Sequence, residues 1–236
     1  MSAAFLALWN GIDRPEARQE YEAWHGLEHV PERVGLPGFV EGWRYANART
    51  YFTLYHLQSL QALQTPEYAD VIAHPTPWSA RMRPRLSEFV RRPCECISAQ
   101  GMGHGVALST VRGVTRDLVA WQQAAQALAQ QALDDGHLLR VTLGFVPADY
   151  ELDYPVGGER ITLLAAGQTT VVCLLEHLSA DLCAQGTSHW LQAMHSLWEQ
   201  VTSEQFQLQN CIPRSALQLP AQGRLAPRTQ WMHRYS

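Results

Sequence analysis

The stretch from residue 39 to residue 57, FVEGWRYANARTYFTLYHL, decides the fold class of this chain of 236 residues. Its two ends, 39–46 and 50–57, are rich in aromatic and β-branched residues, and only a short polar segment separates them. Two β-rich runs joined by so few residues predict a β-hairpin.

The segments on either side of the hairpin complete a recognisable order of elements. Alternating apolar residues predict a strand over 4–9, and apolar residues spaced three or four apart predict a helix over 15–34. Two short helices, at 60–73 and 78–89, and a closing strand at 90–99 are expected after the hairpin. The order β-α-β-β-α-β is that of a ferredoxin-like unit.

The second half of the chain repeats this order with different residues. The boundary falls at Gly101-Met102-Gly103, so we expect an N-terminal unit over 1–100 and a C-terminal unit with an irregular arm over 101–236. The expected elements of the second half are strands at 104–111, 138–146, 169–175 and 206–212 and helices at 118–133 and 187–201. Helices cover one face of each sheet, so the two bare faces must cover each other. The predicted class is therefore α+β, with tandem ferredoxin-like (βαββαβ) units forming an intramolecular dimeric α+β barrel.

Composition narrows the range of partners. The chain is 46% hydrophobic and 17% charged with a net charge of −4, and it lacks the basic stripe of a nucleic-acid-binding surface. No apolar run reaches the length of about 18 residues that a membrane helix needs, and the N-terminus lacks the basic region of a signal peptide. We expect a cytoplasmic protein that binds a small molecule, with a second copy of the chain as a further candidate partner. Five cysteines without a CxxC pair predict free thiols.

Titratable residues concentrate at 24–33, WHGLEHVPER, inside the first predicted helix. At 100° per residue, Glu28 falls in the apolar stripe and is aimed at the sheet, His29 lies on its flank, and Arg33 lies nearer solvent. The functional interpretation is proton transfer by His29, because imidazole titrates near neutrality, with Glu28 orienting it or sharing its proton. The alternative is a locally paired Glu28 beside a half-exposed His29.

The same segment contains the H-x-x-E-H pattern of inverted zinc peptidases, His25-x-x-Glu28-His29. Two histidines four residues apart on a helix can bind one zinc ion. No later helix offers an obvious glutamate ligand motif, so we expect no metal.

Residues outside that helix extend the candidate site. Tyr45 and His56, from the predicted hairpin, are expected to act as catalytic residues that contact an oxyanion or hydroxyl group. The alternative for His56 is a satisfied core residue. The expected substrate-binding residues are Trp24, His25, Arg33, His74 and Trp78. Trp24 and Trp78 would form apolar walls, and Arg33 would hold a carboxylate.

Several motifs together resemble the EthD-like branch of the dimeric α+β barrel superfamily. They are W-x-x-x-E-H-x-P-E-R (24–33), P-G-F (37–39), W-R-Y (43–45), the aliphatic-aromatic strand 51–57 and H-P-T-P-W (74–78). The resemblance covers residues 3 to about 95, and residues 101–236 match only in the order of elements. It implies a pocket between the sheet and its helices, with His29 as the best carried-over functional residue. The superfamily includes cofactor-free monooxygenases, polyketide cyclases, muconolactone isomerases, aldoxime dehydratases and haem-binding proteins similar to chlorite dismutase.

Three functions remain open at this point. The first is a cofactor-independent enzyme of small-molecule catabolism, an isomerase, cyclase or lyase that acts on an aromatic or lactone-like organic acid by acid–base proton transfer. The second is a protein of the same fold that binds haem, with His177 or His189 as the axial ligand, or a cofactor-free monooxygenase. The third is a non-catalytic module that binds a small ligand. Only the N-terminal half carries the Glu28–His29 pair, so we expect one working site there.

Overall fold

Both halves of the chain contribute strands to one structure. The computed structural model describes all residues except 1–2, 149, 151–163, 222 and 236. The strands are β1 (Ala4–Ile12), β2 (Phe39–Ala46), β3 (Tyr51–Leu57), β4 (Leu86–Gly101), β5 (Ala107–Thr115), β6 (Arg140–Phe145), β7 (Thr169–His177) and β8 (Glu199–Pro213). The α-helices are α1 (Arg18–Trp24), α2 (Val30–Val34), α3 (Pro66–Ala73), α4 (Pro77–Met82), α5 (Leu118–Asp134) and α6 (Ala180–Met194). Shorter helical segments are η1 (Pro15–Ala17), η2 (His25–His29), η3 (Leu60–Gln64), η4 (Arg83–Arg85), η5 (Arg214–Ala216) and η6 (Thr229–Arg234).

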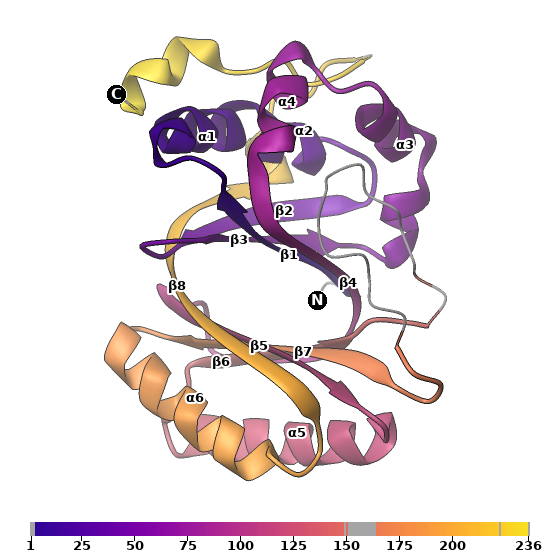
Figure 1. Cartoon of the computed structure of the whole chain (residues 1–236), viewed down its shortest axis with the longest axis vertical. Coiled ribbons are helices and arrows are strands. Elements are labelled where there is room, and N and C mark those ends of the chain that lie inside the picture. The colour runs from indigo at the N-terminus through magenta and orange to yellow at the C-terminus, as the bar shows by residue number, and fades with distance from the viewer. Residues whose placement is uncertain (1–2, 149, 151–163, 222, 236) are drawn as a thin grey trace.

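The strands close one barrel in the order β1-β3-β2-β8-β5-β7-β6-β4. All neighbouring strands are antiparallel, and within each half the order is that of a ferredoxin-like unit, β4-β1-β3-β2 and β8-β5-β7-β6. The helices of the two halves lie on opposite outer sides of the barrel (Figure 1). The predicted α+β fold of tandem ferredoxin-like units in an intramolecular dimeric α+β barrel is confirmed.

Two long strands join the halves. β4 pairs with β1 over 86–95 and with β6 over 95–101. β8 pairs with β5 over 199–207 and with β2 over 207–213. Each of these strands therefore belongs to both four-stranded sheets, which leaves neither sheet with an open edge at the junction.

Two helices differ from their predicted bounds. Pro84 has no backbone N–H and does not continue an α-helix, so α4 ends at Met82. After the single turn η4, the strand β4 begins at Leu86, inside the predicted helix 78–89. α6 begins at Ala180 because the side chain of Ser179 accepts a hydrogen bond from the backbone N–H of Leu182 and caps the helix. The end of the predicted helix 187–201 is the start of β8.

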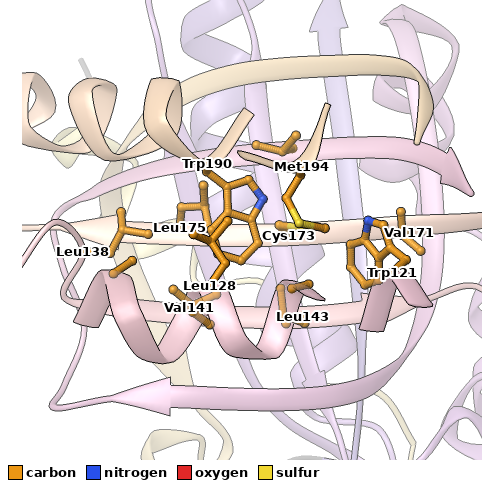
Figure 2. Close-up of a cluster of buried hydrophobic side chains, with 14 of the residues drawn as sticks. Trp121, Leu128, Leu138, Val141, Leu143, Val171, Cys173, Leu175, Trp190 and Met194 are labelled. Atoms are coloured by element: carbon orange, nitrogen blue, oxygen red, sulfur yellow. The ribbon is translucent and has the colours of Figure 1, made fainter. Parts of the chain in front are cut away.

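Strand alternation sorts the side chains into an interior core and two outer layers. The interior core contains aromatic residues of both halves, among them Trp9, Phe52 and Phe206. In the C-terminal half, large side chains such as Trp121 and Trp190 fill the layer between the sheet and the helices α5 and α6 (Figure 2). The corresponding layer of the N-terminal half holds the candidate site.

The chain beyond β8 returns over the helices of the N-terminal half (Figure 1). Arg214 Nη1 donates to the carbonyl of Val34 at 2.9 Å, and Leu217 packs into the core beneath α2 and α3. Among the described residues, no helix has both the length and the apolar character needed to cross a bilayer.

Candidate functional site

The first predicted helix contains a π-helical segment, η2, between α1 and α2. The backbone N–H of Val30 donates to the carbonyl of His25, five residues earlier, where an α-helix bonds over four. This wider turn rotates the residues that follow away from the positions given by a uniform 100° step. Glu32 and Arg33 are both 3% exposed, so the prediction that Arg33 lies nearer solvent is wrong.

A narrow cleft lies between this helix and the outer face of the N-terminal sheet. Four predicted residues line it: Trp24, His25, His29 and Arg33. The remaining lining is apolar side chains, chiefly Leu6, Leu8, Phe39, Leu86 and Phe89, with polar groups from Asn10, Tyr21, Thr53, Tyr55, Tyr68 and Arg91. The cavity volume is about 20 Å³, which is room for about one water molecule. A larger ligand has to displace side chains to enter.

His29 is buried in this layer, with 7% of its surface exposed. Its Nδ1 atom has no hydrogen-bond partner among the described residues. The ring centroid lies 4.4 Å from that of Trp24 and 5.6 Å from that of His25. Burial lowers the pKa of His29 well below its usual value, and the charges of Arg33 and Arg83 lower it further. His29 is therefore a neutral base at neutral pH.

His25 is held in one orientation by Arg44. The Nε atom of Arg44 donates to Nδ1 of His25 at 2.9 Å. A guanidinium group only donates, so Nδ1 of neutral His25 accepts and the ring proton lies on Nε2, 3.4 Å from Thr53 Oγ1. The ring also stacks on Tyr21 at a centroid distance of 5.0 Å. Burial, followed by the charge of Arg44, lowers the pKa of His25 well below its usual value.

Glu28 turns away from the sheet, contrary to the helical projection. Its Oε1 atom accepts hydrogen bonds from Thr76 Oγ1 at 2.6 Å, Ser79 Oγ at 2.9 Å and Trp24 Nε1 at 3.2 Å. Among the described residues, no hydrogen bond joins Glu28 to His29. Glu28 therefore connects the first helix to the beginning of α4, which corresponds to the alternative of local pairing.

Tyr45 and His56 lie on the other face of the sheet. Tyr45 is 1% exposed within the interior core, and His56 lines a separate cavity of about 160 Å³. Successive residues of a strand point to opposite faces, so Thr53 and Tyr55 of β3 face the first helix instead. The structure thus corrects the expectation that Tyr45 and His56 join His29 in one site.

His74 and Trp78 also lie outside the cleft lining. The side chain of His74 is 77% exposed, and its Nδ1 atom lies 2.8 Å from Asp70 Oδ1. Trp78 packs beside Trp24 in a cluster with Tyr21, so it supports a cleft wall from behind. The expected direct substrate contacts of His74 and Trp78 are not formed by this geometry.

The side chains of the zinc-type pattern are engaged by other partners. Nδ1 of His25 already accepts from Arg44, and the carboxylate of Glu28 is turned towards Thr76 and Ser79. In the part of the chain that the structure describes, no three His, Cys, Asp or Glu side chains are placed to hold a metal ion.

The C-terminal half does not fit a haem between its sheet and helices. Trp121 and Trp190 are 0% and 1% exposed and occupy this layer (Figure 2). His189 is exposed on α6, and Nδ1 of His177 accepts from the backbone N–H of Leu178 at 2.8 Å. The layer between the sheet and the helices of the C-terminal half therefore has no room for a haem macrocycle beside His177 or His189.

Sequence reasoning missed several polar residues of the cleft. Thr53 and Tyr55 could have been found, because they alternate with His56 on a strand with two buried faces. Tyr68 and Arg91 gave no signal, since they reach the cleft from distant segments and contact each other there, with Arg91 Nη2 donating to the Tyr68 hydroxyl at 3.2 Å.

Known structures share this architecture at low sequence identity. A protein described as anthrone oxidase-like matches with a TM-score of 0.61 and 12% identity, covering 94% of this chain and 99% of that one. A provisionally assigned monooxygenase from Fusobacterium nucleatum gives 0.54 and 8%, covering 90% and 95%. Another from Lactobacillus acidophilus gives 0.53 and 6%, covering 94% and 98%. No family model matches the chain, and no curated protein does.

These likenesses define the fold. The chain has the fold of a dimeric α+β barrel with both units in a single polypeptide, and these structural neighbours share that architecture over 90–94% of the chain. The EthD-like resemblance of the N-terminal half is compatible with this fold, although none of these neighbours is named as EthD-like.

Proposed function

We propose that the cleft beneath the first helix binds a small, mainly apolar molecule with an acidic O–H or C–H group, and that His29 accepts that proton. The observation that carries the proposal is the buried, neutral His29, whose Nδ1 atom has no hydrogen-bond partner in the described chain. The cleft has the lining usual for a small-molecule site, apolar with a few polar groups, and with a volume of about 20 Å³ its side chains must move aside to admit a ligand.

The charges around His29 decide which substrates it can deprotonate. Burial and the neighbouring arginines keep the imidazole unprotonated, so the base is available at neutral and mildly acidic pH. A lowered pKa also makes it a weak base, so the substrate proton must be acidic. Phenols and carbon acids activated by a carbonyl group are candidates, provided that the cleft stabilises their anions and so lowers the pKa of the bound substrate.

The same charges favour the product of proton transfer. Deprotonation leaves an enolate or phenolate beside an imidazolium ion. Arg33, which is ion-paired with Glu32 at 2.7 Å, and Arg91 line the cleft, and a positive potential stabilises an anion in a site from which water is largely excluded. Arg33, whose charge disfavours the cationic form of His29 before reaction, therefore also lowers the energy of the substrate anion.

We propose a cofactor-independent isomerase, cyclase or lyase acting on an aromatic or lactone-like organic acid. From the anion, these reactions require only that the proton return to another atom or that a leaving group depart. The second candidate function is oxygenation, in which the anion reacts with O₂ as co-substrate. The names of the structural neighbours, one anthrone oxidase-like and two monooxygenases, support this candidate.

Deuterium exchange tests the removal of the substrate proton by His29, which is the first step of both candidate reactions. The purified chain is incubated in D₂O with a panel of phenols, anthrones and lactones, and the recovered compounds are analysed by mass spectrometry. Only carbon-bound positions report the base, because a phenolic O–H exchanges with D₂O unaided. We expect deuterium to enter an acidic C–H position of at least one compound, and His29→Gln to slow this exchange by about 10²-fold or more. The matched control is His74→Gln, because His74 is exposed outside the cleft.

The outcomes separate the candidate functions. Exchange without further change supports isomerase-type chemistry, whereas uptake of oxygen atoms supports oxygenation. Unchanged exchange in His29→Gln refutes the assigned role of His29. Saturable binding with no exchange of any compound supports the non-catalytic module.

A further inference from the structure

A second and larger hollow lies on another side of the first helix. This groove, of about 370 Å³, is bounded by η2, by the strands β2 and β8, and by the C-terminal segment η6. Gly26 lines it at the helix, and Trp231 and Tyr235 line it at the C-terminal segment. The residues described above as lining the His29 cleft do not line this groove.

The groove is positively charged. Its lining contains three guanidinium groups, those of Arg44, Arg228 and Arg234, and one carboxylate, that of Glu22. The Glu22 carboxylate accepts a hydrogen bond from the Tyr51 hydroxyl at 2.8 Å. Within the described part of the chain, none of the three arginines forms an ion pair with an acidic side chain. Among the residues that the structure describes, the lining of the groove therefore carries an excess of positive charge.

Arg44 is the buried member of the three, with 6% of its surface exposed. Its Nε atom donates to His25 Nδ1 and its Nη2 atom donates to the backbone carbonyl of Glu22 at 3.3 Å. Both acceptors are uncharged, and a buried charge without a counter-ion is costly. Nη1 lies over Gly26, where an added Cβ would approach it to 2.5 Å. An anion in the groove would supply the missing counter-charge.

The C-terminal segment presents the other two arginines in a fixed arrangement. The guanidinium carbons of Arg228 and Arg234 lie 4.9 Å and 4.7 Å from the centroid of the Trp231 ring, within the range of cation–π contacts. The backbone N–H of Arg228 donates to the carbonyl of Leu27 at 3.0 Å. Gln19 Nε2 donates to the carbonyl of Tyr235 at 2.6 Å. These bonds hold the segment against the first helix.

We propose that this groove is a binding site for a small organic anion, held between Arg44 and two arginines of the C-terminal segment, Arg228 just before η6 and Arg234 at its end. Carboxylates and phosphates share the required chemistry, since the planar guanidinium group offers several N–H donors to paired oxygen atoms. The volume lies within the range of about 300–1,000 Å³ that is usual for small-molecule sites. The site is separate from the His29 cleft, so its test does not depend on the proposed reaction.

Isothermal titration calorimetry with the full chain tests the proposal, using benzoate in one series and inorganic phosphate in the other. We expect saturable binding of one probe per chain, weakened by added salt. The double variant Arg228→Gln/Arg234→Gln removes the charges of the half-buried Arg228 and the exposed Arg234 and should weaken binding at least tenfold. The matched control, Arg116→Gln, alters an exposed arginine that pairs with Glu199 in the other half and should bind as the unaltered chain does.

A variant without a charge change separates site binding from general attraction. In Gly26→Ala the new Cβ would meet the Tyr235 hydroxyl and Arg44 Nη1, so we expect binding at least tenfold weaker at unchanged net charge. Tighter binding of phosphate or of benzoate shows whether the natural ligand carries a phosphate or a carboxylate group. The proposal is overturned if neither probe binds saturably, or if both variants bind as tightly as the Arg116→Gln control.

Discussion

The two buried histidines of the first helix should make the protein sensitive to mild acid. His25 and His29 are 6% and 7% exposed, and burial lowers the pKa of both well below the usual value of 6.5. Below pH 6.5 the unfolded chain binds a proton at each histidine, whereas the folded chain does not. The contribution of each buried histidine to the free energy of unfolding is therefore fully present above pH 6.5. It is lost as the pH falls towards the pKa of that histidine in the folded chain.

The magnitude follows from this linkage. A histidine that stays neutral in the folded chain at pH 5.5, and has its ordinary pKa when unfolded, lowers the free energy of unfolding by between about 1 and 2 kcal/mol between pH 7.5 and 5.5. The two together lower it by roughly 3 kcal/mol, a large part of the roughly 5–15 kcal/mol typical of a folded protein.

Urea unfolding, followed by tryptophan fluorescence at pH 7.5 and 5.5, measures the effect in the unaltered chain and in His29→Gln. The variant should lose between about 1 and 2 kcal/mol less stability over this interval, because it lacks one of the two titrating rings. His189→Gln, an exposed position on α6, serves as the control and should follow the unaltered chain. The reasoning is refuted if the stability difference between His29→Gln and the unaltered chain is the same at both pH values.

Two further substitutions test the contacts that position the first helix. Ser79→Ala removes a buried hydroxyl that donates to the Glu28 carboxylate, and urea unfolding should show a loss of about 1.5–3 kcal/mol; a loss below 0.5 kcal/mol would contradict the assigned contact. Pro31→Ala restores a backbone N–H that can compete for the carbonyl of Leu27, which accepts from Arg228. Trypsin should then cut after Arg228 faster than in the unaltered chain, and an unchanged cleavage rate would show that this bond does not hold the C-terminal segment.

Most of the fold could be predicted because it depends on local spacing. The aromatic and β-branched runs at 39–46 and 50–57 match β2 and β3 closely. The closure of the barrel followed from one requirement, that the bare face of each sheet be covered. The bounds of α6 could not be predicted in the same way, because capping by Ser179 outweighed the apolar pattern further along.

The sequence predicted which segment supplies residues of the candidate site, but it did not predict where their side chains point. The segment 24–33 does supply four residues of the cleft. A uniform helical projection failed because the π-helical segment changes the rotation between Trp24 and Arg33. Pro31 indicates that the helix is irregular there, but a proline alone does not specify whether the backbone kinks or widens.

The sequence by itself determined the order of strands and helices, the pairing of two similar units, and the concentration of titratable groups on the first helix. These features depend on residues close together along the chain. Only the tertiary structure decided that Glu28 binds Thr76 and Ser79, that Tyr45 and His56 face the barrel interior, and that Arg44 contacts both His25 and the groove beneath η6. These contacts join residues far apart in sequence, so they depend on strand register and helix rotation, which spacing along the chain does not specify.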